Sequence, residues 1–405
     1  MTIPDTTPWT WRVVRFVLGA YLAVHYFALA PFADELFSRS GVLGDPSMLP
    51  TWPWFPNPLF LVEAPPFARG FVAVLGVLGI LLACGVRASA VAVLLWFGGA
   101  CLVTRNVFIR NPGMPYVGWM LLAVPFVETA ASSIRTSGAG RRGPIPAILM
   151  LGAWGLLAVG YTLSGLHKLQ SPSWQDGTAL ARLFENPLAR PTLFGAWVQS
   201  LPEDVLRCAT WGTLALEVLA VPFAFFRRTR PWMWTAFMLM HAGIMLSVDF
   251  VDLTLGMVMI HLFVFDPAWI PPRPAREPAI VFFDGVCNLC NGFVSALMEE
   301  DGGRNLRYAS LQGETARSFG LTVGEGGQAS VVVVMDGVRH VRSDAVLAIA
   351  ASLGGLWRLL TVFRFLPRSF RDAAYRFIAA RRYALFGSKS TCRVPTPAER
   401  GYFLP

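Results

Sequence analysis

The chain has 405 residues, of which 54% are hydrophobic and only 15% are charged. This composition excludes a wholly soluble protein, and the apolar excess lies before residue 271. The net charge of +9 comes almost entirely from arginine, since Lys168 and Lys389 are the only lysines. Because the arginines flank apolar segments and are scattered through the tail, we expect them to meet lipid headgroups and predict no nucleic-acid partner.

Apolar runs of roughly 18–23 residues are long enough to cross a bilayer. About eight occur before residue 271, and they are 11–32, 67–86, 88–108, 114–131, 145–167, 206–226, 231–249 and 252–270. Short basic connections, at Arg141-Arg142 and at Arg227-Arg228, indicate the cytoplasmic side. With an even number of spans, both chain ends are cytoplasmic. We therefore predict a multi-pass protein of a bacterial-type plasma membrane.

One lysine stands out in this arginine-rich half. Lys168 follows His167 at the end of an apolar run. A lysine near hydrocarbon is pushed towards its neutral, basic form, whereas an arginine keeps its proton. The position therefore indicates a basic or ligand-binding role for Lys168. The alternative is an interfacial anchor that reaches the headgroups.

Other ionisable residues fall within the apolar runs: His25, Glu217, His241 and His261. Polar groups at this depth usually face the interior of a helix bundle, where they line a path for ligands or protons. The alternative for each histidine is a structural residue whose hydrogen bonds are satisfied.

The pattern changes after a proline-rich segment at 271–278, which we interpret as a linker. Residues 1–270 are then a membrane domain and residues 279–405 a small α/β domain. Ala279–Phe283 predicts a buried strand and Asn288–Glu300 a helix, while residues 331–341 predict a hairpin that turns at Asp336-Gly337. The predicted fold class is a transmembrane bundle of about eight helices followed by a thioredoxin-like α/β domain.

Two cysteines stand at the junction between this strand and helix. Cys287 and Cys290 are separated by two residues, and free N–H groups at the helix start stabilise a thiolate on the first sulfur. This layout predicts reversible dithiol–disulfide exchange. One alternative is an inert pair, and another is a zinc site, for which the tail offers only these two cysteines, Cys392 and His340. Because a second paired motif is missing, we predict no metal.

The run Asp284-Gly-Val-Cys287-Asn-Leu-Cys290 resembles the signature of the DCC family of thiol-disulfide oxidoreductases. Further motifs extend the resemblance over residues 278–405, and they are Phe365-Leu-Pro367, Arg371-Asp372, Tyr375, Arg381-Arg-Tyr383, Phe386-Gly387 and Cys392. The resemblance implies a thioredoxin-like fold in which Cys287 is the more exposed nucleophile and Cys290 resolves the mixed disulfide. Asp284 and Cys392 support the motif. Unlike ordinary thioredoxins, the chain has no proline before Val331.

The segment from Tyr161 to Gly177 resembles the HTTM domain of vitamin K-dependent gamma-carboxylase and its bacterial relatives, through Gly165-Leu-His-Lys168-Leu and Trp174. The resemblance covers residues 10–270. It implies that Lys168 is the base that deprotonates a reduced quinone in carboxylase or epoxidase-type chemistry. A vitamin K-like quinone, not covalently bound, is then the expected cofactor. The residues expected to bind it are His167, Trp174, Glu217, His241 and His261.

These observations together predict a membrane-bound thiol-disulfide oxidoreductase. Its partners are the bilayer, a quinone or other lipid, and a thiol protein. The alternative function is a membrane binding or transport protein whose dithiol domain senses redox state or recruits a partner. A gamma-carboxylase proper would need a substrate-peptide domain, and the tail does not resemble one.

Overall fold

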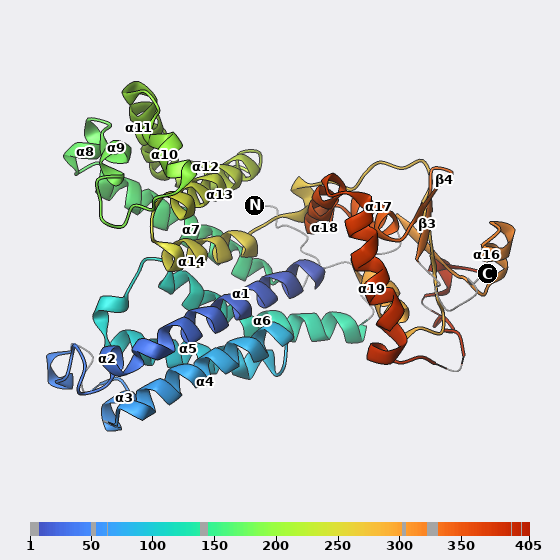
Figure 1. Cartoon of the computed structure of the whole chain (residues 1–405), viewed down its shortest axis with the longest axis horizontal. Coiled ribbons are helices and arrows are strands. Elements are labelled where there is room, and N and C mark those ends of the chain that lie inside the picture. Colours follow the sequence, from blue (N-terminus) through green and yellow to red (C-terminus); the bar gives the residue numbers. More distant parts are fainter. Residues whose placement is uncertain are drawn as a thin grey trace. The chain divides into compact units, whose positions relative to one another are not determined.

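The computed structural model describes residues 8–49, 54–62, 64–137, 145–301, 305–321, 331–389, 391–397 and 399–405. The chain divides into two compact units, and the main boundary lies between Phe265 and Asp266. The first unit is helical and the second is a mixed α/β unit (Figure 1). Residues 271–278, all of which are described, form neither helix nor strand.

The helical unit contains α1 (Pro8–Leu29), α2 (Ala33–Phe37), α3 (Pro58–Leu61), α4 (Pro65–Cys84), α5 (Ala88–Arg105), α6 (Met114–Ser137), α7 (Ala147–Lys168), α8 (Pro172–Gln175), α9 (Ala179–Leu183), α10 (Leu193–Gln199), α11 (Glu203–Val218), α12 (Ala220–Phe225), α13 (Arg230–Ser247) and α14 (Val251–Phe263). Within it, α4 packs against α5, and α7 packs against α11 and α12.

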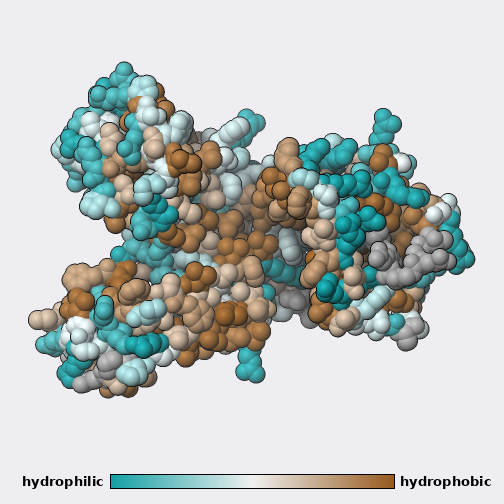
Figure 2. Space-filling model, in the orientation of Figure 1, coloured by the Kyte–Doolittle hydropathy of each residue, from teal (hydrophilic) through white to brown (hydrophobic). Residues whose placement is uncertain are grey.

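Five helices in the described residues are long and apolar enough to cross a membrane. They are Pro8–Phe37, Pro66–Cys84, Ala88–Arg105, Met114–Ser132 and Ala147–Lys168. Their outward faces are hydrophobic, as on α4, where Val74, Val77 and Ile80 are exposed. Figure 2 shows hydrophobic residues gathered over the surface of this unit. Such a surface suits hydrocarbon rather than water.

The predicted fold class is confirmed, but the number of candidate spans among the described residues is five rather than about eight. The 206–226 run is interrupted at Leu219, between α11 and α12, and the 252–270 run ends as a helix at Phe263. The 231–249 run forms α13, which carries a buried Arg230 and His241 and is not among the five. The basic connection at Arg141-Arg142 lies outside the described residues.

The α/β unit is built around one sheet of five strands, β1 (Ala279–Phe283), β2 (Leu306–Ser310), β3 (Val332–Met335), β4 (Val338–Val341) and β5 (Phe403–Leu404). The strand order is β4-β3-β1-β2-β5. β1 pairs parallel to β2 and antiparallel to β3, so Val281 lies opposite Tyr308 on one side and Val333 on the other. The predicted strand at 279–283 and the predicted hairpin are both confirmed.

Helices cover both faces of this sheet. They are α15 (Asn288–Asp301), α16 (Glu314–Ser318), α17 (Ser343–Leu353), α18 (Gly355–Leu359) and α19 (Arg368–Phe386). One core joins Val281 and Phe283 to Val294 of α15 and Ile349 of α17. The other face carries Phe282 and packs on α16 and its neighbours. Because β1 is central and covered on both faces, its sequence is continuously apolar rather than alternating.

Candidate functional site

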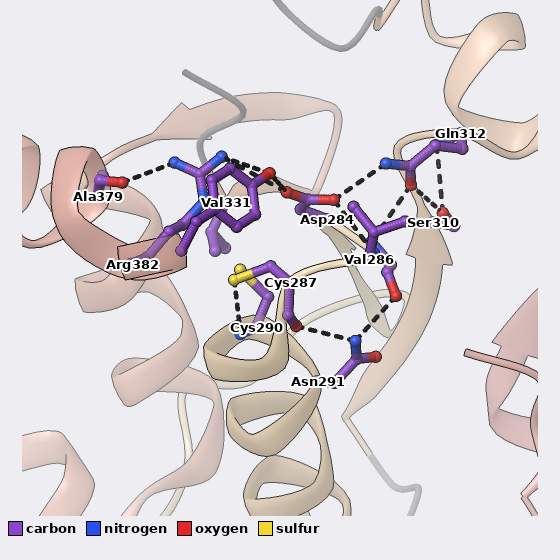
Figure 3. Close-up of polar contacts among 12 residues, drawn as sticks. Asp284, Val286, Cys287, Cys290, Asn291, Ser310, Gln312, Val331, Ala379 and Arg382 are labelled. Atoms are coloured by element: carbon purple, nitrogen blue, oxygen red, sulfur yellow. Dashed lines mark hydrogen bonds and ion pairs between the residues drawn. The ribbon is translucent and has the colours of Figure 1, made fainter. Parts of the chain in front are cut away.

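Two free cysteines lie where β1 leads into α15, at the carboxyl end of a central strand. Cys287 directly precedes α15, and Cys290 lies in its first turn. The backbone N–H of Cys290 donates to Cys287 Sγ at 3.4 Å (Figure 3). This contact satisfies one of the free N–H groups at the helix start and stabilises negative charge on that sulfur.

Both sulfurs are enclosed by the unit's core. The prediction that Cys287 is the more exposed cysteine is wrong, because Cys287 is 0% exposed and Cys290 is 8% exposed. Both belong to the core cluster that contains Val294 and Leu297. In this arrangement the dithiol is closed to a protein substrate.

The backbone that follows α19 covers Cys287. In this covering segment, Gly387–Lys389, Ser388 forms an isolated antiparallel bridge with Cys287. The Asn288 N–H donates to the first residue of the segment at 3.4 Å, and the N–H of its last residue donates to the Val286 carbonyl at 2.8 Å. The two paired segments are short and far apart in the chain, so neither shows a periodic pattern of apolar residues. The sequence therefore did not predict this covering segment.

A buried carboxylate lies beside the dithiol and accepts four hydrogen bonds (Figure 3). Asp284 is 2% exposed. Its Oδ1 accepts from the Val286 N–H at 3.2 Å and from Gln312 Nε2 at 3.0 Å. Its Oδ2 accepts from Tyr383 Oη and from Arg382 Nη2, the latter at 3.4 Å. Burial alone raises the pKa of Asp284, but these donors and the guanidinium charge together lower it below its usual value.

Cys290 is held as a protonated thiol. Burial, the neighbouring Cys287 and the charge of Asp284 raise the pKa of Cys290 to about 12, while the guanidinium of Arg382 acts in the opposite direction. Burial is the largest of these effects, and the charges of the carboxylate and the guanidinium adjust the pKa of this thiol in opposite directions. Arg382 and Tyr383 belong to a motif recognised in the sequence, but their contact with Asp284 was not predicted.

A hydrogen bond to α19, and not a proline, holds the start of β3. The Val331 N–H donates to Tyr375 Oη at 2.9 Å. Burial raises the pKa of Tyr375, and the nearby Cys290 adds to that effect. Tyr375 thus connects the start of β3 to the surroundings of the dithiol.

A third sulfur lies close to this turn. A Cβ added at Gly285 would lie 3.1 Å from Cys392 Sγ, and Cys392 is only partly buried. His340 lies on β4. Among the described residues, no group of three or more His, Cys, Asp or Glu side chains is close enough to hold a metal ion. The four residues of the alternative zinc site are thus not gathered there.

In the helical unit, Lys168 and Glu217 form an ion pair. Lys168 Nζ lies 2.5 Å from Glu217 Oε1 and 4.7 Å from the centroid of the Trp174 ring. Glu217 is 3% exposed, and its Oε2 has no hydrogen-bond partner among the described residues. Lys168 thus lies between a carboxylate and an aromatic face, and its role as a neutral base stays a prediction.

A tyrosine that the sequence reasoning missed joins two of the predicted histidines. Tyr161 Oη lies 2.5 Å from His241 Nε2 and 3.5 Å from His261 Nε2. His241 Nδ1 is buried and unpartnered within the described part of the chain. Tyr161 is two helical turns before Lys168, so both lie on one face of α7. This spacing could have identified Tyr161 from the sequence. His167, in contrast, is exposed.

We call Tyr161, Lys168, Glu217, His241 and His261 the polar cluster. Its members come from four helices, α7, α11, α13 and α14. Trp174, on α8, lies at its edge through the ring contact with Lys168. Of the residues expected to bind a cofactor, all except His167 are therefore in or beside this cluster.

Two protein families match separate parts of the chain. The DCC1-like thiol-disulfide oxidoreductase family matches residues 281–388. The lipase maturation factor transmembrane domain matches residues 50–270, which is more than half of the chain.

Curated relatives cover the C-terminal unit. The uncharacterized protein YuxK of Bacillus subtilis is 38% identical over 130 residues, which are 31% of this chain and 93% of the relative. A chloroplastic DCC family protein of Arabidopsis thaliana is 36% identical over 118 residues, which are 28% of this chain and 69% of the relative. No solved structure matches the chain. For the helical unit, the HTTM resemblance stays a prediction beside the match to the lipase maturation factor domain.

Proposed function

This chain belongs to the family of the lipase maturation factor transmembrane domain and its C-terminal unit to the DCC family, and from this premise we propose that it is a membrane-bound enzyme that exchanges thiols and disulfides through Cys287 and Cys290. The observation that carries the proposal is the cysteine pair at the start of α15, where the Cys290 N–H donates to the Cys287 sulfur. The partner is a protein that carries a thiol or a disulfide.

The exchange proceeds in two displacements. The Cys287 thiolate attacks one sulfur of a substrate disulfide, forms a mixed disulfide and releases the other substrate sulfur as a thiolate. Cys290 then loses its proton to solvent, attacks the Cys287 sulfur and releases the second substrate sulfur. The substrate gains two electrons and takes up two protons, while the two cysteines become a disulfide. The reverse sequence oxidises a substrate dithiol.

Access requires movement of the covering segment Gly387–Lys389. Cys287 is reached only when its bridge to Ser388 opens. Gly387 has φ +73° and ψ 177°, a conformation that is essentially restricted to glycine. We propose that this residue is the hinge between α19 and the cover.

The test uses the full-length protein in mild detergent. Alkylation and mass spectrometry after dithiothreitol or oxidised glutathione should show a disulfide between Cys287 and Cys290 that forms and reopens. Cys290→Ser should accumulate a glutathione adduct on Cys287, because the resolving sulfur is lost. Cys287→Ser should accumulate none, and the matched control Cys392→Ser should exchange like the parent.

Two results would contradict this proposal. One is a disulfide that joins Cys287 to Cys392 in place of Cys290. The other is zinc bound at one ion per chain that protects both cysteines from alkylation. Either would mean that the pair is not an exchanging dithiol.

A second proposal concerns the polar cluster, and two unpartnered buried atoms favour it. Buried polar atoms are normally hydrogen-bonded, so Glu217 Oε2 and His241 Nδ1 have capacity for a ligand. We propose that they hold the reduced, hydroquinone form of a quinone-like lipid, whose hydroxyl can donate to Glu217 Oε2. When bound, this lipid supplies two-electron carrier chemistry. Co-purifying quinones, identified by mass spectrometry, should disappear in Glu217→Gln. Carboxylase-type chemistry of Lys168 stays a prediction, and retained turnover in Lys168→Arg would rule out proton abstraction by this residue.

We also propose that the C-terminal unit lies in the cytoplasm. The basic connection Arg227–Arg230 between α12 and α13 supports this side, because cytoplasmic loops are rich in arginine and lysine. The argument from an even number of spans does not apply to the five candidate spans. A membrane-impermeant thiol reagent should label Cys392 in inside-out vesicles and leave it unlabelled in intact cells.

A further inference from the structure

The helical unit contains a cavity of about 640 Å³ whose lining includes no member of the polar cluster. Its walls come from α1, α5, α6 and the connection before α6, and they are mostly apolar. Four aromatic rings line it: Tyr21, Tyr26, Trp96 and Trp119. A cavity of this size and character is typical of sites for small, largely apolar ligands.

One end of the cavity is polar and built around a carboxylate. Asp252 Oδ1 accepts from Tyr21 Oη at 2.6 Å and lies 2.8 Å from His25 Nδ1. Its Oδ2 accepts from Asn111 Nδ2 at 2.5 Å. These three partners line the cavity, and Asp252 contacts all of them. The carboxylate therefore orients the groups that a ligand would meet.

The fold brings these residues together by specific means. Tyr21 and His25 are four residues apart and so share one face of α1. Asp252 lies in the first turn of α14, where a negative charge is favourable. The connection before α6 meets α14 at two glycines, since a Cβ added at Gly256 would lie 3.1 Å from Gly113 Cα. This close approach of two backbones places Asn111 beside Asp252.

The free nitrogen of His25 defines what the site recognises. An ionised carboxylate only accepts hydrogen bonds, so the Nδ1 that faces Asp252 carries the proton. Nε2 has no partner among the described residues, so it is left for a ligand. It accepts a hydrogen bond from a ligand when the ring is neutral and donates one when the ring is protonated, and a neutral hydroxyl satisfies it in either state.

We propose that this cavity binds a membrane-soluble amphiphile whose neutral hydroxyl is hydrogen-bonded to His25 Nε2 and whose apolar body lies among the four aromatic rings. The volume, the aromatic lining and the unpaired nitrogen of His25 together specify this class. The Asp252–His25 pair is the recognition element, and it is separate from both the dithiol and the polar cluster. The exposed Arg110 also lines the cavity and defines the competing ligand, an amphiphile with an anionic head.

The experiment compares two photoreactive probes on the full-length protein in mild detergent. One is a long-chain alkylphenol with a diazirine in its chain, and the other is a fatty acid of the same chain length. Labelled peptides are identified by mass spectrometry, and apparent affinity is obtained by competition with the unmodified molecule. We expect the phenol to label peptides of α1, α5 and α6 and to bind more tightly than the acid.

Two variants should weaken phenol binding for different reasons. His25→Leu removes the nitrogen that bonds the hydroxyl, and we expect affinity to fall about tenfold, as for loss of one hydrogen bond. Gly118→Leu fills the cavity from α6, where a Cβ meets Trp96 only at an ordinary 3.6 Å, so labelling of these helices should be lost. The matched controls are His167→Leu, at an exposed histidine, and Gly155→Leu, at a glycine with open space around it.

The outcomes separate the alternatives. Equal phenol labelling in Gly118→Leu and in the parent protein, with thermal unfolding unchanged, would show that the cavity is not the binding site. Tighter binding of the fatty acid, lost in Arg110→Gln and retained in His25→Leu, would overturn the proposed hydroxyl ligand in favour of an anionic one. Loss of labelling in the control Gly155→Leu would show that probes bind the lipid-facing surface only.

Discussion

The chain buries two carboxylates beside its candidate sites, and it satisfies them in opposite ways. Asp284 of the α/β unit accepts four hydrogen bonds, including one from Arg382. Glu217 of the helical unit has one partner, Lys168, and its second oxygen has none among the described residues. A fully satisfied carboxylate supports structure, whereas one with spare capacity is a candidate for binding. The predictions below test this difference.

The largest effect is expected at Glu217, whose side chain has Lys168 as its one partner among the described residues. Lys168→Met leaves Glu217 as an uncompensated buried charge, which should destabilise the protein by about 3 to 5 kcal/mol. The measurement is the thermal unfolding midpoint in detergent, followed by intrinsic fluorescence. Lys168→Met combined with Glu217→Gln should recover much of the loss, because no charge then remains buried.

The double variant decides the interpretation of that result. If it is as unstable as Lys168→Met alone, the loss comes from packing of the lysine chain against Trp174 rather than from charge. If Lys168→Met is as stable as the parent, Glu217 is already protonated or reached by water. Either result would remove the contrast with Asp284.

A smaller loss is expected when Asp284 loses its cation. Arg382→Leu leaves the carboxylate with Tyr383, Gln312 and the Val286 N–H as donors. We expect a destabilisation of about 2 kcal/mol, below the usual range for a broken buried pair, because three donors remain. Arg381→Leu is the matched control, since Arg381 is exposed and stacks only on Phe377. A loss as large as that of Lys168→Met would show that the remaining donors do not compensate.

The dithiol was predictable because its determinants are local. A strand, a turn and a helix start follow one another within twelve residues of sequence, and each leaves its own pattern. The polar cluster was predictable only as separate candidates, since Tyr161, Glu217 and His261 meet through packing of helices far apart in the chain. Length alone overestimated the spans, because neither the break at Leu219 nor the end of the last helix at Phe263 interrupts the apolar run in which it lies.

The covering segment Gly387–Lys389 was not predictable from the sequence, and substitution of Gly387 tests its role. Gly387→Ala places a Cβ on backbone at φ +73°, which should cost about 1 to 2 kcal/mol and loosen the covering segment. Alkylation of Cys287 should become severalfold faster, as followed by mass spectrometry. Gly401→Ala is the control, because a Cβ there meets nothing within 4 Å. If Gly387→Ala is destabilised but its Cys287 is alkylated at the parent rate, the covering segment does not control access to this thiol.

The smallest effect is expected from the charge of Asp284 on Cys290. This charge adds to burial and to Cys287 in raising the pKa of Cys290 to about 12, so Asp284→Asn should lower that pKa. The folded thiol keeps its proton above the pH at which an unfolded thiol loses it, so parent stability falls as pH rises beyond about 9. Asp284→Asn should reduce this alkaline loss and speed alkylation of Cys290 severalfold at about pH 9 to 10.

The same substitution should also reduce the loss of stability at low pH. The lowered pKa of Asp284 contributes stability that is present above the unfolded value and lost as pH falls through the folded one. Asp284→Asn lacks this contribution, so its stability should vary less with pH at both ends than that of the parent. Asp336→Asn removes an equal charge from an exposed turn and should leave the profile unchanged. If Asp284→Asn matches this control, the carboxylate serves only to hold α19 against the sheet and does not tune the dithiol.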